Sequence, residues 1–476
     1  MNSFKKTSLV LILILILLVI GYCSLFRKKE QPPPIDSTEK SLVIYNMYDS
    51  EDVFAPLIQQ YLTKNPYSRI TYKSFSNFEE YEKRILNELA EGEGPDIFAM
   101  PNSWFVKNKK KLVPMPVAQG TPETFRSLFV DVAAKDLVIT DAGGVEQVYG
   151  IPLYVDTLGI YYNKDQFEDA IPTRGKPAAT WSGIKDDVYL LTKDGAAANQ
   201  FDVSGIAMGV TNNVSYAVDV LFALMIQNGT QFYNDNMSEA TFSSASVGAT
   251  RPAVDALEFY VSFADKAQKH YSWNKYMAGD YDKGDVSAFA AGEVSMIFGY
   301  STTYEEILKE VNRLKSDVDT VIKDDAIGTA LFPQLVDPSV STEKRDTFAN
   351  YFAFGVARTS EFSDAAWDFL TFLATPESEK FYFEETHKPT SLRSLIPEQS
   401  NDPIYGSFAK QVGYAESFPV IDYIGFREQF TSVIDAVNNG KSTGTVLTSL
   451  QDEITAMLPT GGYIVPIDPG YESELL

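Results

Sequence analysis

The sequence predicts an α/β protein with more than one domain, and three observations support this class. Near the start of the chain, short apolar runs alternate with amphipathic helical patterns, which indicates a parallel sheet covered by helices. The length of 476 residues exceeds what one hydrophobic core usually organises, so two domains are expected. No segment repeats with the period of a solenoid or a propeller.

The first elements alternate between strand and helix. The first helix is expected to follow Ser50, which can cap its N-terminus, and to end at Asn65-Pro66. Ligands of such sheets bind beyond the carboxyl ends of the strands, here at the loops 46–50 and 101–104. The expected elements are strands at 42–45, 69–75 and 96–100 and helices at 51–62 and 78–90.

The rest of the chain continues the mixture of helices and buried strands. Hydrophobic periodicity predicts the helices, and short apolar runs predict the strands. The segment 317–346 is polar and rich in turn residues, so it is expected at the surface. Expected helices lie at 214–227, 252–269, 364–373 and 429–437, and expected strands at 205–210, 294–298 and 351–356.

One acid interrupts a segment that otherwise has the pattern of a buried strand. Residues 153–162 are rich in apolar, β-branched and aromatic side chains, which predicts a strand covered on both faces. A buried carboxylate is costly unless cations, hydrogen-bond donors or a ligand satisfy it. Asp156 is therefore either held by backbone amides or a nearby lysine, or it faces a ligand in a cleft.

Cysteine and histidine are scarce, which excludes several kinds of site. Cys23 is the single cysteine, so the chain has no disulfide framework and no cysteine zinc site, and two histidines offer little material for metal or acid–base chemistry. We therefore expect no metal and no cofactor. Residues 41–476 carry 34 basic and 61 acidic side chains, a net charge of −27. This charge argues against nucleic acid as a partner.

The N-terminus predicts attachment to a membrane. A basic start precedes an apolar run from Leu9 to Phe26, whose length lies between a secretory signal and a minimal membrane span. Residues 1–26 are therefore expected to be a signal or membrane anchor, and the proline-rich residues 27–40 a linker. Lipidation of Cys23 and an uncleaved membrane helix both stay open, because Tyr22 occupies the place where a lipoprotein signal normally has a small residue.

Five sequence blocks stand in a characteristic order along the chain. They are GEGPDIFAM (92–100), YGIPLYVDTLGIYYNKD (149–165), TWSGI (180–184), FAAGEVSMIFGY (289–300) and AWDFLTFLATPE (366–377). Their order and spacing resemble the extracellular solute-binding proteins of ABC importers, in the branch that includes oligosaccharide binders. The resemblance extends from about residue 41 to residue 455.

The resemblance implies a two-lobed periplasmic-binding-protein-like fold. Each lobe would be a mostly parallel sheet with flanking helices, and a hinge would join the two lobes around the ligand. The chain would cross between the lobes near 151–157, 293–300 and 350–356. On this basis residues 41–152 and 298–351 are expected to form lobe I, and residues 153–297 and 352–476 to form lobe II.

The same resemblance implies a set of ligand contacts. Asp156 would accept sugar hydroxyls and Tyr300 would stack on a sugar ring. Trp104 and Tyr300 are equally expected as core or cap residues, and Arg427 as a solvated charge on a helix. Trp181 and Trp367 are expected to pack in the core. The implied contacts are Asp49, Asn102, Ser103, Trp104, Asp156, Asn212, Asn213, Tyr300 and Arg427.

Carboxylates and aromatics together suit carbohydrate recognition, because acids accept hydroxyls and rings stack on apolar sugar faces. We expect a non-enzymatic, monomeric receptor at the outer face of the cytoplasmic membrane that delivers an oligosaccharide to the permease subunits of an ABC transporter. A polyamine or another small solute is an alternative ligand, since Asp49 and Asp156 could surround a cation. A sensing or adhesion module without a transporter and a surface glycoside hydrolase are further alternatives.

Overall fold

The computed structural model describes residues 39–141, 143–197, 199–245, 250–277, 284–316, 321–339 and 344–463. The predicted anchor, most of the predicted linker and Cys23 lie outside these residues. Residues Ser41–Leu476 form one compact unit. Among the described residues, no helix combines the length and the apolar character needed to cross a membrane.

The first part of this unit is built on a six-stranded mixed sheet. Its strands are β1 (Lys40–Met47), β2 (Ser68–Phe75), β3 (Ile97–Pro101), β4 (Leu112–Val113), β7 (Ile151–Pro152) and β14 (Phe352–Ala357). The order is β2-β1-β3-β14-β4, with β7 also paired to β14. β1 and β3 are parallel, which the alternation of strand and helix predicted. β14 comes from far along the chain and runs antiparallel to its neighbours.

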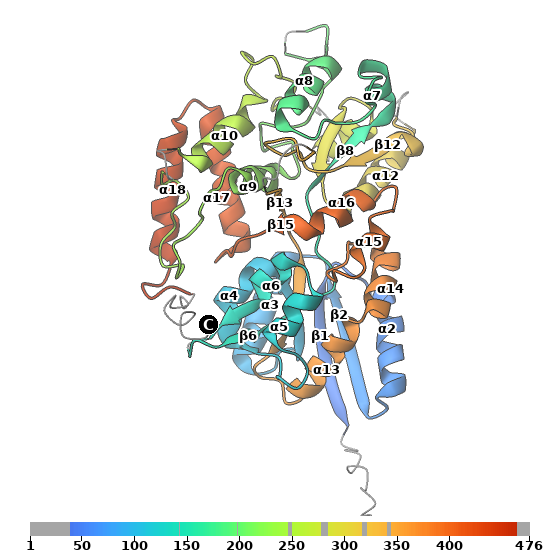
Figure 1. Ribbon diagram of the computed structural model, residues 1–476, viewed down its shortest axis with the longest axis vertical. Coiled ribbons are helices and arrows are strands. Elements are labelled where there is room, and N and C mark those ends of the chain that lie inside the picture. Colours follow the sequence, from blue (N-terminus) through green and yellow to red (C-terminus); the bar gives the residue numbers. More distant parts are fainter. Residues whose placement is uncertain are drawn as a thin grey trace, which may run out of the picture. The chain divides into compact units, whose positions relative to one another are not determined.

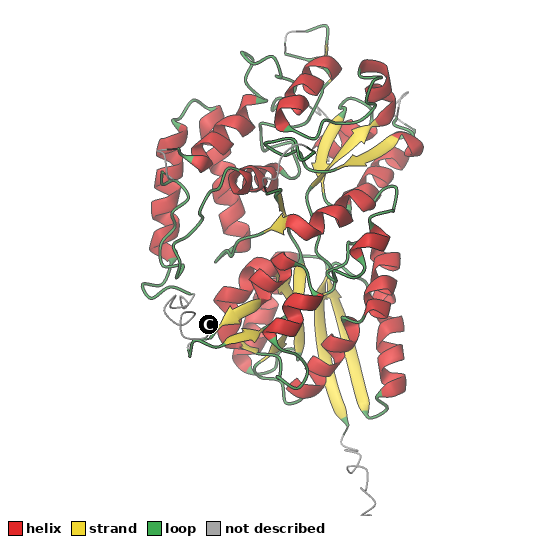
Figure 2. Cartoon of the chain, viewed as in Figure 1, coloured by secondary structure: helices red, strands yellow, loops and turns green. Residues whose placement is uncertain are grey.

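Helices cover this sheet, and the first two agree with the sequence prediction (Figures 1 and 2). They are α2 (Glu51–Lys64), α3 (Phe78–Glu91), α13 (Ser363–Leu373) and α14 (Pro376–Thr386). α2 begins after Ser50 with two acids in its first turn, where the helix dipole favours them, and Asn65 follows its last residue. Its buried face contacts α13 and α14, and Tyr61 donates a hydrogen bond to Asp368 at 2.7 Å.

A second sheet has three strands, β8 (Gly159–Asn163), β11 (Met296–Gly299) and β12 (Ile327–Ala330), in the order β11-β8-β12. Every residue of the central strand β8 is buried, as the apolar run predicted. Both pairings are antiparallel, so the expectation of a mostly parallel sheet is wrong here. An apolar run indicates burial on both faces, but it carries no information about the direction of the neighbouring strands.

The strand pairings agree with two of the three predicted crossings between the sheets. The chain passes from β7 to β8 through 153–158, and it re-enters the first sheet at β14. The crossing predicted near 293–300 is wrong, because β11 is followed by α12 (Thr303–Leu314) and by β12, which pairs with β8. The pairings therefore group β12 with the second sheet and β14 with the first, opposite to the predicted assignment of 298–351 and 352–476. A local sequence pattern can predict a strand, but the strand with which it pairs depends on residues far away in the sequence.

The remaining helices surround the second sheet and extend away from it (Figure 1). The predicted strand at 205–210 is instead an irregular buried segment, in which Ala207 N donates to Met296 O at 3.1 Å. Trp181 and Trp367 are buried in the core, which confirms their predicted packing role. The main helices are α7 (Lys164–Ala170), α8 (Trp181–Leu191), α9 (Ala217–Gln227), α10 (Pro252–Ser262), α11 (Gly284–Ala290), α16 (Gly406–Gln411), α17 (Tyr423–Asn438) and α18 (Thr443–Met457).

Short elements complete the described chain. The helices are η1 (Asn102–Trp104), α4 (Phe105–Asn108), η2 (Lys109–Lys111), α5 (Pro122–Leu128), α6 (Asp131–Leu137), η3 (Asp324–Ala326), α15 (Ile396–Gln399) and η4 (Val412–Tyr414). The strands are β5 (Val138–Thr140), β6 (Glu146–Val148), β9 (Lys193–Asp194), β10 (Phe201–Val203), β13 (Thr347–Phe348) and β15 (Ala415–Glu416).

Candidate functional site

Asp156 lies where the chain passes from the first sheet to the second, and its carboxylate is satisfied within the protein. Oδ1 accepts from the backbone of Thr157 at 2.9 Å, and the backbone and hydroxyl of Ser301 donate to Asp156 at 3.1 and 2.7 Å. Burial raises its pKa to about 6, and these hydrogen bonds oppose the rise. Of the two sequence hypotheses, the contacts favour an acid held by donors of the chain.

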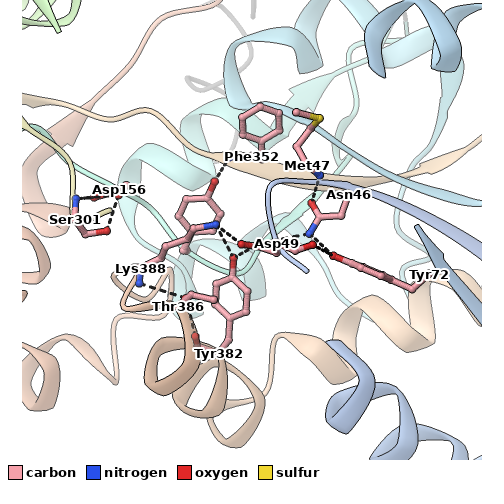
Figure 3. A network of polar contacts seen from close by, with 11 residues as sticks. Asn46, Met47, Asp49, Tyr72, Asp156, Ser301, Phe352, Tyr382, Thr386 and Lys388 are labelled. Carbon is pink, nitrogen blue, oxygen red and sulfur yellow. Dashed lines mark hydrogen bonds and ion pairs between the residues drawn. The ribbon is translucent and has the colours of Figure 1, made fainter. Parts of the chain in front are cut away.

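Asp49 is also compensated, by a buried ion pair. Lys388 Nζ lies 2.5 Å from Oδ1, and the Tyr382 hydroxyl donates to Oδ2 at 2.7 Å. Figure 3 shows Lys388 and Tyr382 converging on this carboxylate. The Lys388 ammonium also lies 4.6 Å from the centroid of the Tyr154 ring, a favourable cation–π distance. The Asp49 carboxylate is thus neutralised by a cation of the protein itself.

The loop that carries Lys388 is fixed by an acid of α14. Glu379 is buried, and its carboxylate accepts from the hydroxyls of Thr390 and Ser391 at 2.5 and 2.7 Å and from the Ser391 backbone at 3.1 Å. Burial raises the pKa of Glu379 to about 8 despite these donors. These hydrogen bonds hold the loop in which Lys388 is paired with Asp49.

A second ion pair is formed by Asp219 of α9 and Arg427 of α17. Asp219 is completely buried and also accepts a hydrogen bond from the Tyr300 hydroxyl at 2.7 Å. Burial alone would lower the pKa of Arg427, but the Asp219 carboxylate raises it above its ordinary value. The structure thus joins two predicted contacts, Tyr300 and Arg427, through an acid that sequence reasoning missed. An acid inside the apolar helix α9 was the signal that could have revealed Asp219.

Aromatic side chains lead from this ion pair to the first sheet. The guanidinium of Arg427 lies 5.5 Å from the centroid of the Tyr423 ring. The Tyr423 ring is 5.4 Å from that of Phe78, which also contacts Trp104 at 5.3 Å and Phe352 at 6.0 Å. Such rings offer flat apolar surfaces next to polar groups, the combination that a sugar requires.

Tyr48 adds an exposed ring to the same set. It directly follows β1, its side chain is 58% exposed, and its ring contacts Phe352 at 5.8 Å. Its φ of 70° lies in the left-handed region, which is unfavourable for a large side chain. Sequence reasoning did not select Tyr48, although it lies in the predicted ligand loop 46–50.

Two hollows adjoin these side chains. A small cavity of about 20 Å³ brings together Asn102, Ser103, Asn350, Tyr423 and Arg427. A larger one of about 310 Å³, which we call the near hollow, continues from Arg427 along α17. Among the described residues, the Ser103 hydroxyl has no hydrogen-bond partner, while Asn102 donates to Asp136 at 2.8 Å.

The two predicted asparagines of the second part lie elsewhere. Asn213 supports the loop 271–277, because its amide nitrogen donates to Asn274 O at 3.1 Å and to Met277 O at 2.8 Å, and its oxygen accepts from Trp273 at 2.9 Å. Asn212 lines a separate hollow of about 710 Å³, which we call the far hollow, at the other end of α17. Neither residue lines the near hollow or the small cavity.

Two sheets linked by repeated chain crossings, with charged and aromatic side chains gathered between them, define a two-lobed solute-binding fold. The chain belongs to the family of bacterial extracellular solute-binding proteins, whose family model matches residues 57–405. Members of this family act outside the cytoplasm, as the family description states.

Known proteins similar to this chain are distant in sequence. A curated binding protein of Brucella abortus (strain 2308) is 20% identical over 291 residues, which span 61% of each chain. The sugar-binding protein MalE from Xanthomonas citri is 18% identical, with a TM-score of 0.69 over 88% of this chain and 97% of that one. A cyclo/maltodextrin-binding protein complexed with maltotetraose is 16% identical, with a TM-score of 0.66 over 90% and 98% of the two chains. At these identities the likeness shows the fold.

Proposed function

We propose that the protein is an extracytoplasmic receptor that binds a neutral oligosaccharide and delivers it to an ABC importer. The ligand would contact the exposed side of the Arg427 pair and the rings of Tyr48, Tyr423 and Trp104. Binding would favour the closed arrangement of the two sheet-and-helix parts only through contacts that the ligand makes in that arrangement.

One observation carries the choice of a neutral ligand: the three buried acids at the site already have partners. Asp49 is paired with Lys388, Asp219 with Arg427, and Asp156 accepts from Ser301. A polyamine needs carboxylates that are free to neutralise its ammonium groups. Rings and hydrogen-bonding groups beside acids that are already bonded within the protein suit hydroxyl-rich ligands better.

The solved structures support this ligand class. Their descriptions include complexes with maltotetraose, with mannotriose and with cycloalternan. Those ligands belong to those proteins, and their common chemistry is that of a neutral oligosaccharide. Delivery to a permease and tethering through the N-terminus, by lipidated Cys23 or by a membrane helix, complete the proposal.

Titration at two ionic strengths tests the ligand class. We expect at least one of maltotetraose, mannotriose or xylotriose to bind by calorimetry with nearly the same affinity at low and high salt, because stacking and neutral hydrogen bonds are weakly screened. Spermidine serves as the charged control. Tight, salt-sensitive binding of spermidine without a response to any oligosaccharide would overturn the proposal.

A further inference from the structure

One face of α17 borders both the near hollow and the far hollow. The α17 residues that line them recur at intervals of three or four, the spacing of a single helix face. The buried face of the helix is a different one, formed by Phe426, Phe430, Val433 and Ile434. The lining residues are Ile424, Arg427, Glu428 and Thr431 in the near hollow and Asp435, Asn438 and Asn439 in the far hollow.

The two hollows meet at consecutive residues of the opposite wall. Thr211 lines the near hollow and Asn212 lines the far one. The Thr211 hydroxyl donates to Asp435 at 2.5 Å, which ties the two walls together at the junction. Between Arg427 and Asn438 the helix rises by roughly 16 Å. The two hollows therefore follow one another along the same face of α17, on either side of the Thr211–Asp435 hydrogen bond. We call this line of two hollows, from the Arg427 ion pair to the C-terminal end of α17, the groove.

The far end of this groove presents an exposed ring on a loop that is held in place. Tyr276 is 78% exposed, and Lys275 Nζ lies 5.3 Å from its centroid. The buried side chain of Asn274 accepts from Tyr276 N at 2.9 Å and donates to the Tyr271 hydroxyl at 3.0 Å. The buried amide therefore fixes the backbone that carries Tyr276 and the hydroxyl of Tyr271.

The amides of α17 present acceptors beside these rings. Asn438 donates to Gly209 O and Asn439 to Asp435 O, each at 2.8 Å. These bonds use the amide nitrogens, and no described residue donates to the two amide oxygens. Fixed carbonyl oxygens next to an exposed aromatic ring provide hydroxyl acceptors and a stacking surface, the two elements of sugar recognition.

We propose that the groove along α17 extends the ligand site and holds the outer units of a long oligosaccharide. The far hollow of about 710 Å³ has the size of a small-molecule site in its own right, for which roughly 300–1,000 Å³ is usual. The inference rests on the proposed function and adds to it a preference for long oligosaccharides. The protein prefers longer chains because units beyond the Arg427 site reach Tyr276 and Asn438.

Calorimetry with chains of increasing length tests this preference. The full-length protein is titrated with maltose, maltotriose, maltotetraose and maltoheptaose, and with the corresponding manno- and xylo-oligosaccharides. In the series that binds, affinity should rise with length. Tyr276→Ala should weaken the longest chain about tenfold and leave the shortest unchanged, since only the long chain reaches the ring. Asn438→Ala should act in the same direction.

Tyr189→Ala is the matched control, because Tyr189 of α8 is also exposed and lies outside the groove. It should leave all affinities unchanged. Two results would contradict the proposed role of the groove but not the proposed function. One is an affinity that does not rise with chain length, and the other is a rise that Tyr276→Ala and Asn438→Ala leave intact. Failure of every oligosaccharide to bind would overturn the proposed function, and the groove with it.

Discussion

The two buried ion pairs near the chain crossings differ in their access to solvent. In the Asp49–Lys388 pair, the side chains are 9% and 10% exposed. In the Asp219–Arg427 pair, Asp219 is fully buried but Arg427 is 26% exposed and lines two hollows. Tyrosines contact both pairs. The same chemistry is therefore closed to solvent at one place and leaves a cation partly exposed at the other.

The largest effect should come from the closed pair. Lys388→Met leaves the buried Asp49 carboxylate without its cation, so we expect the free energy of unfolding to fall by about 3–5 kcal/mol, measured by urea denaturation. The double variant Asp49→Asn with Lys388→Met should recover most of this loss, since it leaves no buried charge. A single variant as stable as the wild type would contradict the structural role of the pair.

The next effect should be a dependence of folding stability on pH that comes from the buried carboxyl of Asp156. Its pKa is about 6 in the folded protein and 3.8 by default, so the unfolded chain releases the proton first. The contribution of Asp156 to stability should therefore fall as pH rises from about 4 to about 6, by something on the order of 2 kcal/mol, while Glu379, whose pKa burial raises to about 8, lowers stability further up to that pH. Asp156→Asn should have a shallower slope than the wild type in urea denaturation across that range, because it loses only the part due to Asp156. Identical slopes for both proteins would refute the raised pKa.

The open pair should respond in affinity more than in stability. Arg427→Lys keeps a cation for Asp219 but loses the planar group over Tyr423, so oligosaccharide affinity should fall about tenfold by calorimetry. Arg174→Lys is the matched control, because Arg174 forms a half-exposed ion pair with Asp187 outside the site. An equal loss of affinity in both variants would mean that Arg427 acts only through general stability.

The smallest effect should come from Tyr48. Tyr48→Gly removes the exposed ring and relieves the left-handed backbone, so affinity should fall about fivefold while stability stays within about 1 kcal/mol. Tyr48→Phe keeps the ring and should bind nearly as the wild type does. Unchanged affinity of the glycine variant would remove Tyr48 from the site.

Several features were predictable because they depend on neighbouring residues only. The alternation from β1 to β3 and the end of α2 at Asn65 follow from local periodicity and capping, and the burial of Trp181 and Trp367 was expected from the sequence blocks of the family resemblance in which they lie. The same local signals failed at 205–210, where an apolar run forms no strand. A buried segment needs apolar side chains whether or not its backbone is hydrogen-bonded to a neighbouring strand.

The sequence by itself determined the α/β class, the first elements and the kinds of side chain available to a ligand, because each is written in local pattern and composition. The tertiary structure alone decided partners: β12 with β8, Lys388 with Asp49, and Asp219 with Arg427. These partners are separated by more than a hundred residues, and no local propensity encodes such a choice. Packing decides which acids are paired within the fold and which cation stays partly exposed.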